Sequence, residues 1–477
     1  MASWPGFVGG SYTSRASMLA GERAMNCYPA RLQGEAASLA LMLAPVPGTV
    51  DFATLTDAPI RALWVDEQTS RLFAVAGRRL VEVVENGTPT VRGTVLVDTN
   101  PASLASNGEN ELLVVSGTRG DVLNLTTGVF TTGEVSAVTM AGAIDTFLLG
   151  LDAATGTLKI SEAGDALTWD PTQVAQRSAA PDPWQAMVVA RNEIVLIGAS
   201  SGEVWYNKGS SPFPFALRAG SVFDIGIAAA WSLTLFGGSV AWVGRHGRTG
   251  ALGVYWLNGY TPVPISTDAV DWSLLQARET VGMSDAVGWS YGRMGQEFYV
   301  LELPKADLTW VYERATGRWH QRGKWDVATG VFGAYRPRYH VDAFEFSVVG
   351  DRAAGRLYKF SETVYTDVGS SVLRRERRVP LVSTEHRRRY LDYVELECQR
   401  GVGLQAGQGS DPQVMLRVSG DGGQTWGTER TRGIGKVGQY GTRVRWPRCG
   451  SGLRLGVEIA ATDPVATYWG DLYVGLS

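Results

Sequence analysis

The chain has 477 residues, of which 44% are hydrophobic and 19% are charged, and its formal net charge is −3. This is an ordinary globular composition with enough apolar residues for a large core. The cysteines Cys27, Cys398 and Cys449 form no C-x-x-C pair, so the sequence indicates neither a cysteine zinc site nor a disulfide framework, and a reducing cytosol suits it. The N-terminus lacks a basic stretch followed by an apolar run, so we expect no signal peptide.

Residues 1–50 are expected to form an N-terminal arm ahead of the first strand-rich segment. The arm contains two weakly helical stretches, around Ser17–Met25 and Gly34–Leu43. Neither these stretches nor the rest of the chain predicts a long, well-capped amphipathic helix.

Residues 51–365 consist of short apolar runs separated by turn residues. The stretch 71–95, RLFAVAGRRLVEVVENGTPTVRGTV, indicates three strands with a glycine turn and an Asn86-Gly87 turn between them. Further units begin near residues 111, 147, 193, 239, 296 and 344, and the Thr-Gly dipeptides at 127–128, 155–156 and 316–317 are expected at equivalent hairpins. Seven units of about 45 residues match four-stranded blades, so the sequence predicts an all-β fold, a β-propeller of about seven blades, with six as the alternative.

One segment of this region resembles a membrane span in length. Ile225–Gly244 carries no charge over 20 residues, which is enough for a spanning helix. Its apolar residues alternate with small polar ones on both sides of Gly237-Gly238, and this period of two indicates a hairpin of half-buried strands. We therefore expect no membrane insertion.

Residues 366–477 are expected to form an additional C-terminal β-rich part. It contains an Asp-box, S-x-D-x-G-x-T-W, a motif of sialidase-like β-propellers, made of Ser419, Asp421, Gly423, Thr425 and Trp426. The motif is first a turn device, because Asp421 can accept backbone hydrogen bonds and the glycines can adopt positive φ. We expect Thr425 and Trp426 to begin a strand, with Trp426 as an apolar anchor. A loosened copy ends the stretch at 161–169.

The net charge conceals an asymmetry. Residues 370–450 hold 15 Lys and Arg against 8 Asp and Glu, an excess of +7, which leaves −10 for the rest of the chain. The densest run comprises Arg374, Arg375, Arg377, Arg378, Arg387, Arg388 and Arg389. The run is either a strand face paired with acidic neighbours or a contact for nucleic acid or an acidic partner.

Catalytic and cofactor motifs are weak in this sequence. A sialidase would need an arginine triad, a Tyr/Glu pair and a general acid, and no spacing ties such residues together here. Gly433–Gly438 matches G-x-G-x-x-G, but a strand-like stretch follows where a dinucleotide site needs a helix. The four histidines are scattered without partners at ligand spacing. We expect no enzymatic activity, no cofactor and no metal.

Elements distributed over about 450 residues carry a family resemblance. They include SRASMLAGERAMNCYPARL near the N-terminus, EIVLIGASSGEVWYNKG in the middle, and RYLDYVELECQRGVG followed by the Asp-box stretch near the end. In this order the chain resembles the tail nozzle, or packaged-DNA stabilisation, proteins of short-tailed bacteriophages. It departs from them at Gly420, where an acidic residue is expected, and in the density of its arginine run.

The resemblance implies a virion protein that is assembled in the host cytoplasm. Six copies would form a ring below the portal and its head-to-tail adaptor, contact tail fibre, spike or needle proteins, surround the packaged double-stranded DNA, retain it and open for ejection. Two alternatives stay open, a host-surface or glycan-binding propeller of the virion and a sialidase-like glycoside hydrolase. The arginine run would then face the DNA channel or, as we favour, an acidic partner surface.

A propeller closes its own sheet edges and needs no partner for its stability. The arm and residues 366–477 lie outside that closure, so we expect them to build the ring, and we expect the isolated protein to be largely monomeric. Deleting residues 1–50 should then leave a folded propeller that no longer joins the particle.

Overall fold

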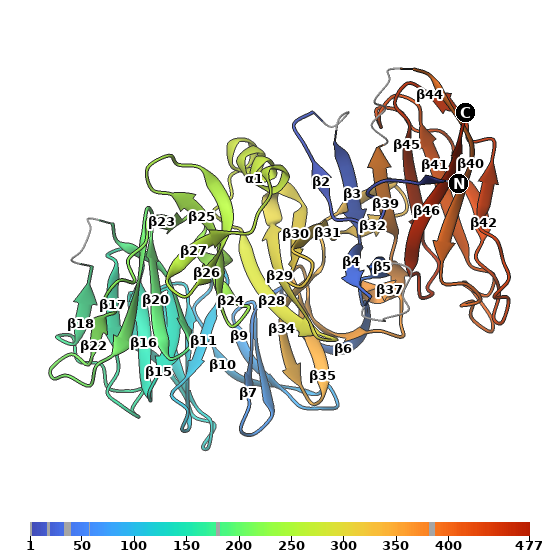
Figure 1. The fold of residues 1–477 in the computed structure, drawn as a ribbon. Helices are drawn as coiled ribbons and strands as arrows, with labels where there is room; N and C mark the ends of the chain where they lie inside the picture. Colours follow the sequence, from blue (N-terminus) through green and yellow to red (C-terminus); the bar gives the residue numbers. More distant parts are fainter. Residues whose placement is uncertain (1, 17–19, 33–39, 57, 178–181, 381–386) are drawn as a thin grey trace.

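A computed structural model describes the chain except residues 1, 17–19, 33–39, 57, 178–181 and 381–386. It shows two parts side by side, a large β-propeller and a smaller β-sandwich that carries both chain termini (Figure 1). The all-β prediction is confirmed.

The propeller contains seven blades of four strands or five among the described residues, and the sixth blade continues into a larger sheet that includes strands of the C-terminal part. The strands of the first four blades are β7 (Ile60–Asp66), β8 (Arg71–Ala76), β9 (Arg79–Val83) and β10 (Pro89–Thr94); β11 (Ser103–Ser106), β12 (Glu111–Ser116), β13 (Arg119–Asn124) and β14 (Phe130–Ser136); β15 (Met140–Ile144), β16 (Phe147–Asp152), β17 (Thr157–Ile160) and β18 (Val174–Gln176); β19 (Trp184–Ala190), β20 (Glu193–Gly198), β21 (Gly202–Asn207) and β22 (Phe215–Leu217). The strands of the last three are β23 (Ile225–Ile227), β24 (Thr234–Phe236), β25 (Ser239–His246), β26 (Leu252–Asn258) and β27 (Thr261–Pro264); β28 (Val287–Arg293), β29 (Gln296–Leu303), β30 (Leu308–Glu313) and β31 (Arg318–Gln321); β34 (Pro337–Ala343), β35 (Phe346–Asp351), β36 (Gly355–Ser361) and β6 (Gly48–Thr56).

Glycine turns hold these hairpins together, as the sequence predicts. Gly87 has φ +84° in the turn between β9 and β10, a conformation that only glycine adopts without strain. The three Thr-Gly turns are not equivalent, however. Gly128 and Gly317 join the third and fourth strands of their blades, whereas Gly156 joins the second and third. The dipeptide identifies a tight turn but not its place in a blade.

The ring of blades is closed by the N-terminal part of the chain. Strand β6 pairs antiparallel with β36 from Gly48↔Ser361 to Thr56↔Gly355, and it is the outermost strand of the seventh blade. The boundary expected at residue 50 therefore falls inside a strand. Interlocking the first and last segments in one sheet removes an unpaired edge.

The apolar segment 225–244 is an interrupted hairpin. Residues Ala230–Ser232 form the short 3₁₀ helix η1, so Trp231 lies in a helical turn and not in the expected strand. Strands β24 and β25 then pair across Gly237 and Gly238, both with positive φ, as predicted. Within the described part of the chain, no helix is long and apolar enough to cross a membrane.

One α-helix stands between the fifth and sixth blades, the single α-helix among the described residues. It is α1, Asp268–Thr280, and it buries Ala269, Val270, Leu274 and Ala277. The sequence analysis missed it. Thr267 followed by two acidic residues in the first turn is an N-terminal signal, but the helix breaks the period of two that elsewhere predicts blades.

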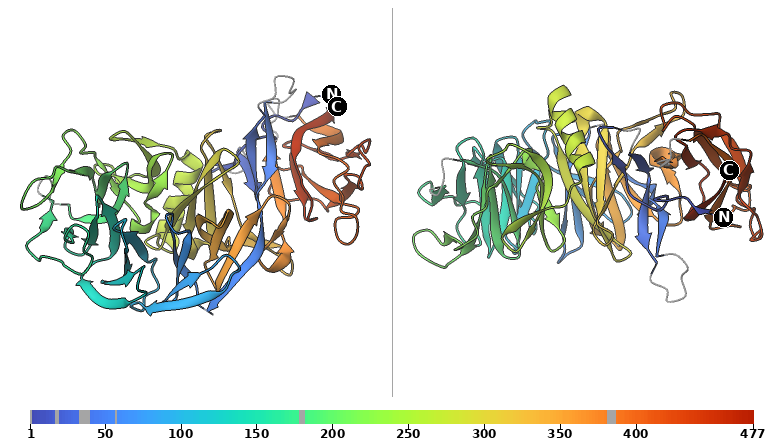
Figure 2. Two further views of the ribbon diagram at one scale, coloured as in Figure 1. Left: turned by 90° about the horizontal axis from the view of Figure 1, so that it is seen from below. Right: turned by 45° about the horizontal axis from the view of Figure 1, so that its top comes forward.

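The N-terminal segment is not a free arm. It forms β1 (Ala2–Ser3), β2 (Tyr12–Thr13), β3 (Gly21–Met25), β4 (Cys27–Arg31) and β5 (Leu41–Pro45). The weakly helical stretches are thus wrong where the structure describes them, at Gly21–Met25 and Leu41–Leu43, and their remainder includes positions outside the described residues. Strand β3 pairs with β31 of the sixth blade on one side and with the sandwich on the other, so the segment joins the two parts (Figure 2).

The C-terminal sandwich consists of β39 (Arg375–Pro380), β40 (Arg389–Cys398), β41 (Gln413–Ser419), β42 (Arg430–Gly433), β43 (Arg445–Pro447), β44 (Ser451–Gly452), β45 (Gly456–Ala461) and β46 (Trp469–Leu476). One sheet runs β3-β39-β45-β41-β42 and the other runs β5-β46-β40-β43. The core between them contains Trp446, Trp469 and Leu472, but also Trp4 and Phe7 from the N-terminus. The short elements β37 (Thr366–Asp367), η3 (Val368–Ser370) and β38 (Ser371–Val372) lead from the seventh blade to the sandwich. The hairpin of β32 (Lys324–Asp326) and β33 (Val331–Gly333) lies between the sixth and seventh blades, and the 3₁₀ helix η2 (Pro304–Ala306) lies between β29 and β30.

Deleting residues 1–50 would remove the start of β6, all of β3 and two core aromatic residues of the sandwich. The expectation that this deletion leaves an intact propeller with only its docking lost is corrected on this ground.

Candidate functional site

The Asp-box is a closed hydrogen-bonded turn. Asp421 accepts hydrogen bonds from the backbone N–H groups of Gln424 (2.9 Å) and Thr425 (3.0 Å) and from the Thr425 hydroxyl (2.6 Å). The Ser419 hydroxyl donates to Asp421 at 2.7 Å and accepts from the Gly423 N–H at 2.8 Å. Bonds from the Thr425 side chain and backbone hold the pKa of Asp421 well below its usual range. A carboxylate occupied in this way is a fixed acceptor.

The Asp-box lies in the sandwich and not in a propeller blade, between β41 and β42. Thr425 and Trp426 do not begin a strand as expected, because β42 starts at Arg430. Trp426 is half-buried and its indole N–H donates to the Gly423 carbonyl at 3.1 Å, which ties the ring to its own turn. The motif thus stands outside the propeller, in the C-terminal part where the sequence places it.

The loosened copy at 161–169 has the same internal geometry, and it is in the propeller between β17 and β18. Asp165 accepts from the Leu167 N–H at 2.9 Å and from the Thr168 hydroxyl at 2.8 Å. The Trp169 indole donates to the Ala166 carbonyl at 2.8 Å. Both turns use the carboxylate to order a loop, and the donors that the carboxylate binds are hydroxyl and backbone groups of that same loop.

The first half of the arginine run lies inside the molecule, on β39. Arg375 and Arg377 are fully buried. Arg377 donates to the carbonyl oxygens of Phe7 (2.7 Å), Gly10 (2.7 Å) and Gly6 (2.6 Å). Arg375 donates to the carbonyls of Val465 (2.7 Å) and Asp463, and burial lowers its pKa to about 10. These two side chains hold irregular segments against the sandwich.

The alternate side chains of β39 enter a charge network on the opposite face. Arg374 pairs with Glu429 at 2.8 Å and with Glu376 at 3.4 Å. Arg378 pairs with Glu458 at 2.7 Å, a carboxylate that Arg417 also approaches at 3.2 Å. The network is built from Arg23, Arg374, Arg378, Arg417, Glu376, Glu429 and Glu458.

The expectation that Arg374, Arg375, Arg377 and Arg378 face a DNA channel or a partner is thus wrong for Arg374, Arg375 and Arg377, which are buried. Arg378 is half-buried and engaged with Glu458. A strand with arginines on both faces can lie between two layers of the structure. From the sequence, the high charge of this strand favoured an exposed position. Arg387 and Arg388 are exposed, with Arg388 donating to the Ser451 hydroxyl at 3.0 Å, while Arg389 is half-buried. These last three stay predicted contacts.

Asn26 is a junction residue that the sequence analysis missed. It has φ +53° and is fully buried. Its side-chain amide donates to the carbonyls of Gly323 (2.8 Å) and Arg374 (2.9 Å), and its side-chain oxygen accepts from the Gly323 N–H at 3.0 Å. Three distant segments meet on one amide. The sequence signal for such a junction is an Asn between two predicted strands, because Asn adopts positive φ more readily than most residues.

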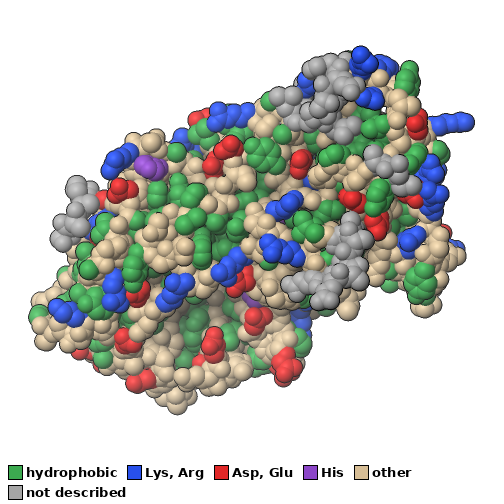
Figure 3. All heavy atoms as spheres, in the orientation of Figure 1, with side chains coloured by type: hydrophobic (Ala, Val, Ile, Leu, Met, Phe, Trp, Pro, Cys, Tyr) green, Lys and Arg blue, Asp and Glu red, His purple; other side chains and the backbone are tan. Residues whose placement is uncertain are grey.

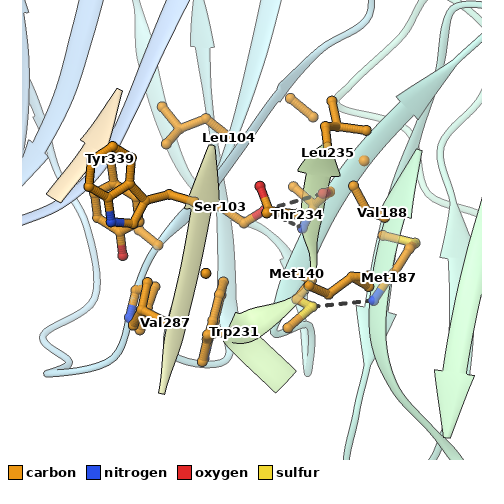
Figure 4. A pocket seen from close by; sticks show the side chains of 18 of the residues that line it. Ser103, Leu104, Met140, Met187, Val188, Trp231, Thr234, Leu235, Val287 and Tyr339 are labelled. Carbon is orange, nitrogen blue, oxygen red and sulfur yellow. Dashed lines mark hydrogen bonds between the residues drawn. The ribbon is translucent and has the colours of Figure 1, made fainter. Parts of the chain in front are cut away.

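A cavity of about 480 Å³ occupies the propeller axis, and its lining comes from the inner strands of all seven blades. Figure 4 shows Met140, Met187, Leu104, Trp231 and Val287 directed into it. The Met187 N–H donates to the Met140 sulfur at 3.4 Å. Most of the lining residues are apolar, but about half of the surface that they present to the cavity is polar, and this volume is that of a small-molecule site.

The titratable side chains offer little for catalysis. His320 is fully buried, and burial together with Arg322 lowers its pKa well below the usual value, so it is neutral. The imidazole Nδ1 of His246 accepts from the backbone N–H of Arg248 at 3.2 Å in a tight turn. Among the described residues, no group of three or more His, Cys, Asp or Glu could hold a metal ion.

Three solved structures are similar to the chain at low identity. The chain is similar to the N-terminal domain of Nup159 (10% identity, TM-score 0.42, 72% of this chain and 99% of that one). It is also similar to virginiamycin B lyase from Staphylococcus aureus (7%, 0.43, 66% and 98%) and to the Cps50 (Swd1) β-propeller domain of Myceliophteria thermophila (9%, 0.43, 66% and 100%). No curated protein matches the chain at a significant level.

Two family models together account for nearly all of the sequence. The model described as bacteriophage P22 Gp10, β-propeller, matches residues 22–365, and the model described as bacteriophage P22 Gp10, β-sandwich, matches residues 374–476. The two matches follow the two parts of the structure in order. The chain therefore belongs to the bacteriophage P22 Gp10 family and is a structural protein of a phage tail.

Proposed function

We propose that copies of this protein form a ring, the nozzle of a short phage tail, which lies below the portal and its adaptor, extends the DNA channel, retains the packaged genome and opens for ejection. The observation that carries the proposal is the match of both parts of the chain, 22–365 and 374–476, to one phage tail family. Six copies, as the resemblance implies, are part of the proposal.

The axial cavity of the propeller is too small for DNA, and this supports a genome channel that lies between subunits. It holds about 480 Å³ and is lined by Trp231, Met140 and Met187. Duplex DNA is a rod whose major groove alone is about 8.5 Å deep. A cavity of this volume is far too small for such a rod, so DNA cannot pass along the axis of one propeller. A channel for the genome has to be enclosed by several copies, whose head-to-tail contacts close a ring.

The ring contacts are proposed on the exposed face of the sandwich. There the arginines with exposed or half-exposed side chains are Arg387, Arg388, Arg400, Arg430, Arg432, Arg443, Arg445 and Arg448. Basic side chains gather along this outer edge and acidic ones along the lower edge of the propeller (Figure 3). Opposite charges on the two parts favour contact between the sandwich of one copy and the propeller of the next.

Assembly on the adaptor tests the proposal. The purified chain should be largely monomeric by light scattering and should form a six-fold ring when a portal–adaptor complex fixes copies at high local concentration. Cryo-electron microscopy of the assembled tail reads out the symmetry. A ring of another symmetry, or no association with the adaptor, would contradict the proposal.

We also propose that the protein has no glycosidase activity, since each Asp-box carboxylate is held by its own turn. A fluorogenic sialoside provides the assay. Hydrolysis by wild type that is lost in Asp421→Ala would favour the hydrolase alternative.

A further inference from the structure

A small pocket lies where the Asp-box meets the N-terminal strands. It has a volume of about 220 Å³, and its lining is Thr13, Gly21, Arg23, Arg378, Pro380, Gly422, Gly423, Gln424, Trp426 and Gly456. These residues come from β2, β3, β39, the Asp-box turn and β45. The two charged residues of this lining are both arginines.

The register of the sheet places these arginines directly opposite one another. Arg23 on β3 is the cross-strand partner of Arg378 on β39. Continuing across the sheet, Arg378 is opposite Glu458, and Glu458 is opposite Arg417. One row across four strands therefore holds three arginines and one glutamate, and like charges in direct opposition destabilise a sheet.

The carboxylate of Glu376 compensates Arg23 poorly. Its nearest approach to the Arg23 guanidinium is 3.7 Å and to that of Arg378 is 3.5 Å, both too long for a strong hydrogen bond. Its oxygen Oε1 is buried and has no hydrogen-bond partner among the described residues. Burial is the main cause that lowers the pKa of Arg23, the attraction of Glu376 opposes it, and the neighbouring Arg378 and Arg374 add to the lowering. The three arginines around Glu376 therefore share one buried carboxylate, and Arg23 is the farthest from it.

Arg23 and the Nη1 end of Arg378 remain within reach of a ligand, because Glu458 occupies the Nε and Nη2 atoms of Arg378 (3.1 and 2.7 Å). The side chains of Arg23 and Arg378 are 28% and 29% exposed. Arg378 lies over the Trp426 ring, 4.9 Å from its centroid, and Arg23 lies over the Phe332 ring at 5.1 Å. These stacking contacts fix the two planar groups, so a ligand meets donors that are already ordered.

We propose that this pocket is a carboxylate-binding site that receives one acidic side chain from the propeller of a neighbouring copy, held between Arg23 and Arg378. A single Asp or Glu side chain fits a pocket of this size, and a carboxylate is the anion that arginine binds through paired, charge-assisted hydrogen bonds. Residues outside 370–450 have a net charge of −10, so the same chain offers acidic side chains that could enter this pocket. The source of the carboxylate rests on the proposed ring, whereas carboxylate binding does not.

The first experiment measures binding to the isolated full-length protein. N-acetyl-L-glutamate methylamide is the probe, and the matching glutamine compound is its neutral control, both followed by saturation-transfer NMR and calorimetry. We expect the glutamate probe to bind about tenfold more tightly than the glutamine one. Arg23→Gln should abolish that preference, while Arg417→Gln, in the same row but outside the pocket, should keep it. Equal binding of the two probes to wild type would overturn the proposal.

Stability separates a lost ligand site from a damaged fold. Arg23→Gln removes both the repulsion opposite Arg378 and the long ion pair with Glu376 (3.7 Å), so its melting temperature should stay close to that of wild type. Incorporation of Arg23→Gln into the ring should fall at least tenfold, and that of Arg417→Gln should be unchanged. Normal incorporation of Arg23→Gln would overturn the assignment of the carboxylate to a neighbouring copy. If wild type formed no ring but still preferred the glutamate probe, the proposed ring would fail and the carboxylate site would stand.

Discussion

In the propeller, the half-buried Arg336 and Arg338 face buried carboxylates, whereas at the base of the sandwich the fully buried Arg375 and Arg377 face mainly backbone carbonyls. Arg338 donates twice to Glu302 (2.9 and 2.8 Å), and Arg336 donates to both oxygens of Asp351 (2.9 and 2.6 Å). Arg377 instead binds three carbonyls of residues 6–10.

The difference follows from which backbone groups each part leaves without a hydrogen-bond partner. Inside a blade, the ladder already uses most backbone groups, so Arg336 and Arg338 are satisfied by carboxylates, whereas Arg61, where the register of β7 shifts, donates to the carbonyls of Asn100 (2.6 Å) and Gly77 (2.8 Å). The N-terminal loop has no ladder, and its carbonyls need donors. Burial by itself would lower the pKa of Arg338, but the attraction and hydrogen bonds of Glu302, together with Tyr339 and Asp285, outweigh it and raise that pKa. No such carboxylate sustains Arg375, and its pKa is lowered. Arginine thus serves as an ion-pair partner in regular structure and as a backbone clamp in irregular structure.

The largest expected effect is at the clamp. Arg377→Met should lower the free energy of unfolding by about 4 kcal/mol, because three buried carbonyls lose their donor and the loop that carries Phe7 loosens. Urea denaturation followed by hydrogen exchange should show the loss in the sandwich first. Arg387→Met, at an exposed position, is the control and should stay within about 0.5 kcal/mol. Equal losses for the two variants would remove the distinction between clamp and surface arginines.

A somewhat smaller loss is expected in the propeller. Glu302→Gln keeps the shape of the side chain but leaves Arg338 as an uncompensated buried charge and weakens the bond from the Trp289 indole (2.8 Å), at a cost of about 3 kcal/mol. The control is Glu297→Gln, whose partner Arg314 is well exposed, and there the change should be below about 1 kcal/mol. Chemical denaturation at neutral pH measures both. Similar costs in the two variants would mean that burial does not govern these pairs.

A pH effect is expected at the connection between the parts. Burial raises the pKa of Asp367 to about 6 from an ordinary 3.8, so the folded state binds a proton more readily than the unfolded state. The ionised carboxylate then destabilises the fold above pH 6, and that cost is relieved as the pH falls toward 4. Lowering the pH from 7 to 5 should raise stability by about 1 kcal/mol in wild type relative to Asp367→Asn. An unchanged difference between the two proteins over this range would contradict it.

The smallest expected effects compare the two Asp-boxes. Asp421→Ala should cost about 1 kcal/mol, and Asp165→Ala less, because Asp421 also accepts the Ser419 hydroxyl. The pKa of each carboxyl is lowered by its hydrogen bonds, so either contribution should disappear as the pH falls below the ordinary carboxyl range. Thermal melts of both variants provide the measurement. A larger loss at Asp165 would show that the surrounding blade, and not the turn, sets the cost.

Much of the propeller could be predicted from local pattern. Turns such as Asn86-Gly87 and Gly237-Gly238 are encoded within four residues, and alternation identifies the strands around them. Pairing between distant segments could not be predicted in this way. No local feature of residues 21–25 indicates that they pair with β31 and β39. Without that pairing in view, the segment has a weakly helical pattern.

The candidate contacts show the same division. The geometry of Asp421 follows from its motif, because all its partners lie within four residues. The burial of Arg375 and Arg377 depends on carbonyls that are 88 to 371 residues away in sequence, and charge alone predicts a solvated surface for them. Arg23 became a candidate only because the sheet register sets it opposite Arg378.

Strand β6 also dictates an order of events during synthesis. It leaves the ribosome before any complete blade, yet its partner β36 follows about 300 residues later. At about 5–20 residues per second, this is a wait of roughly 15–60 seconds. During that time the strand presents an unpaired edge while six blades form behind it. During this interval, β6 can pair wrongly with other nascent chains that are being made on the same mRNA. The speed of translation through the later blades sets how long this risk lasts.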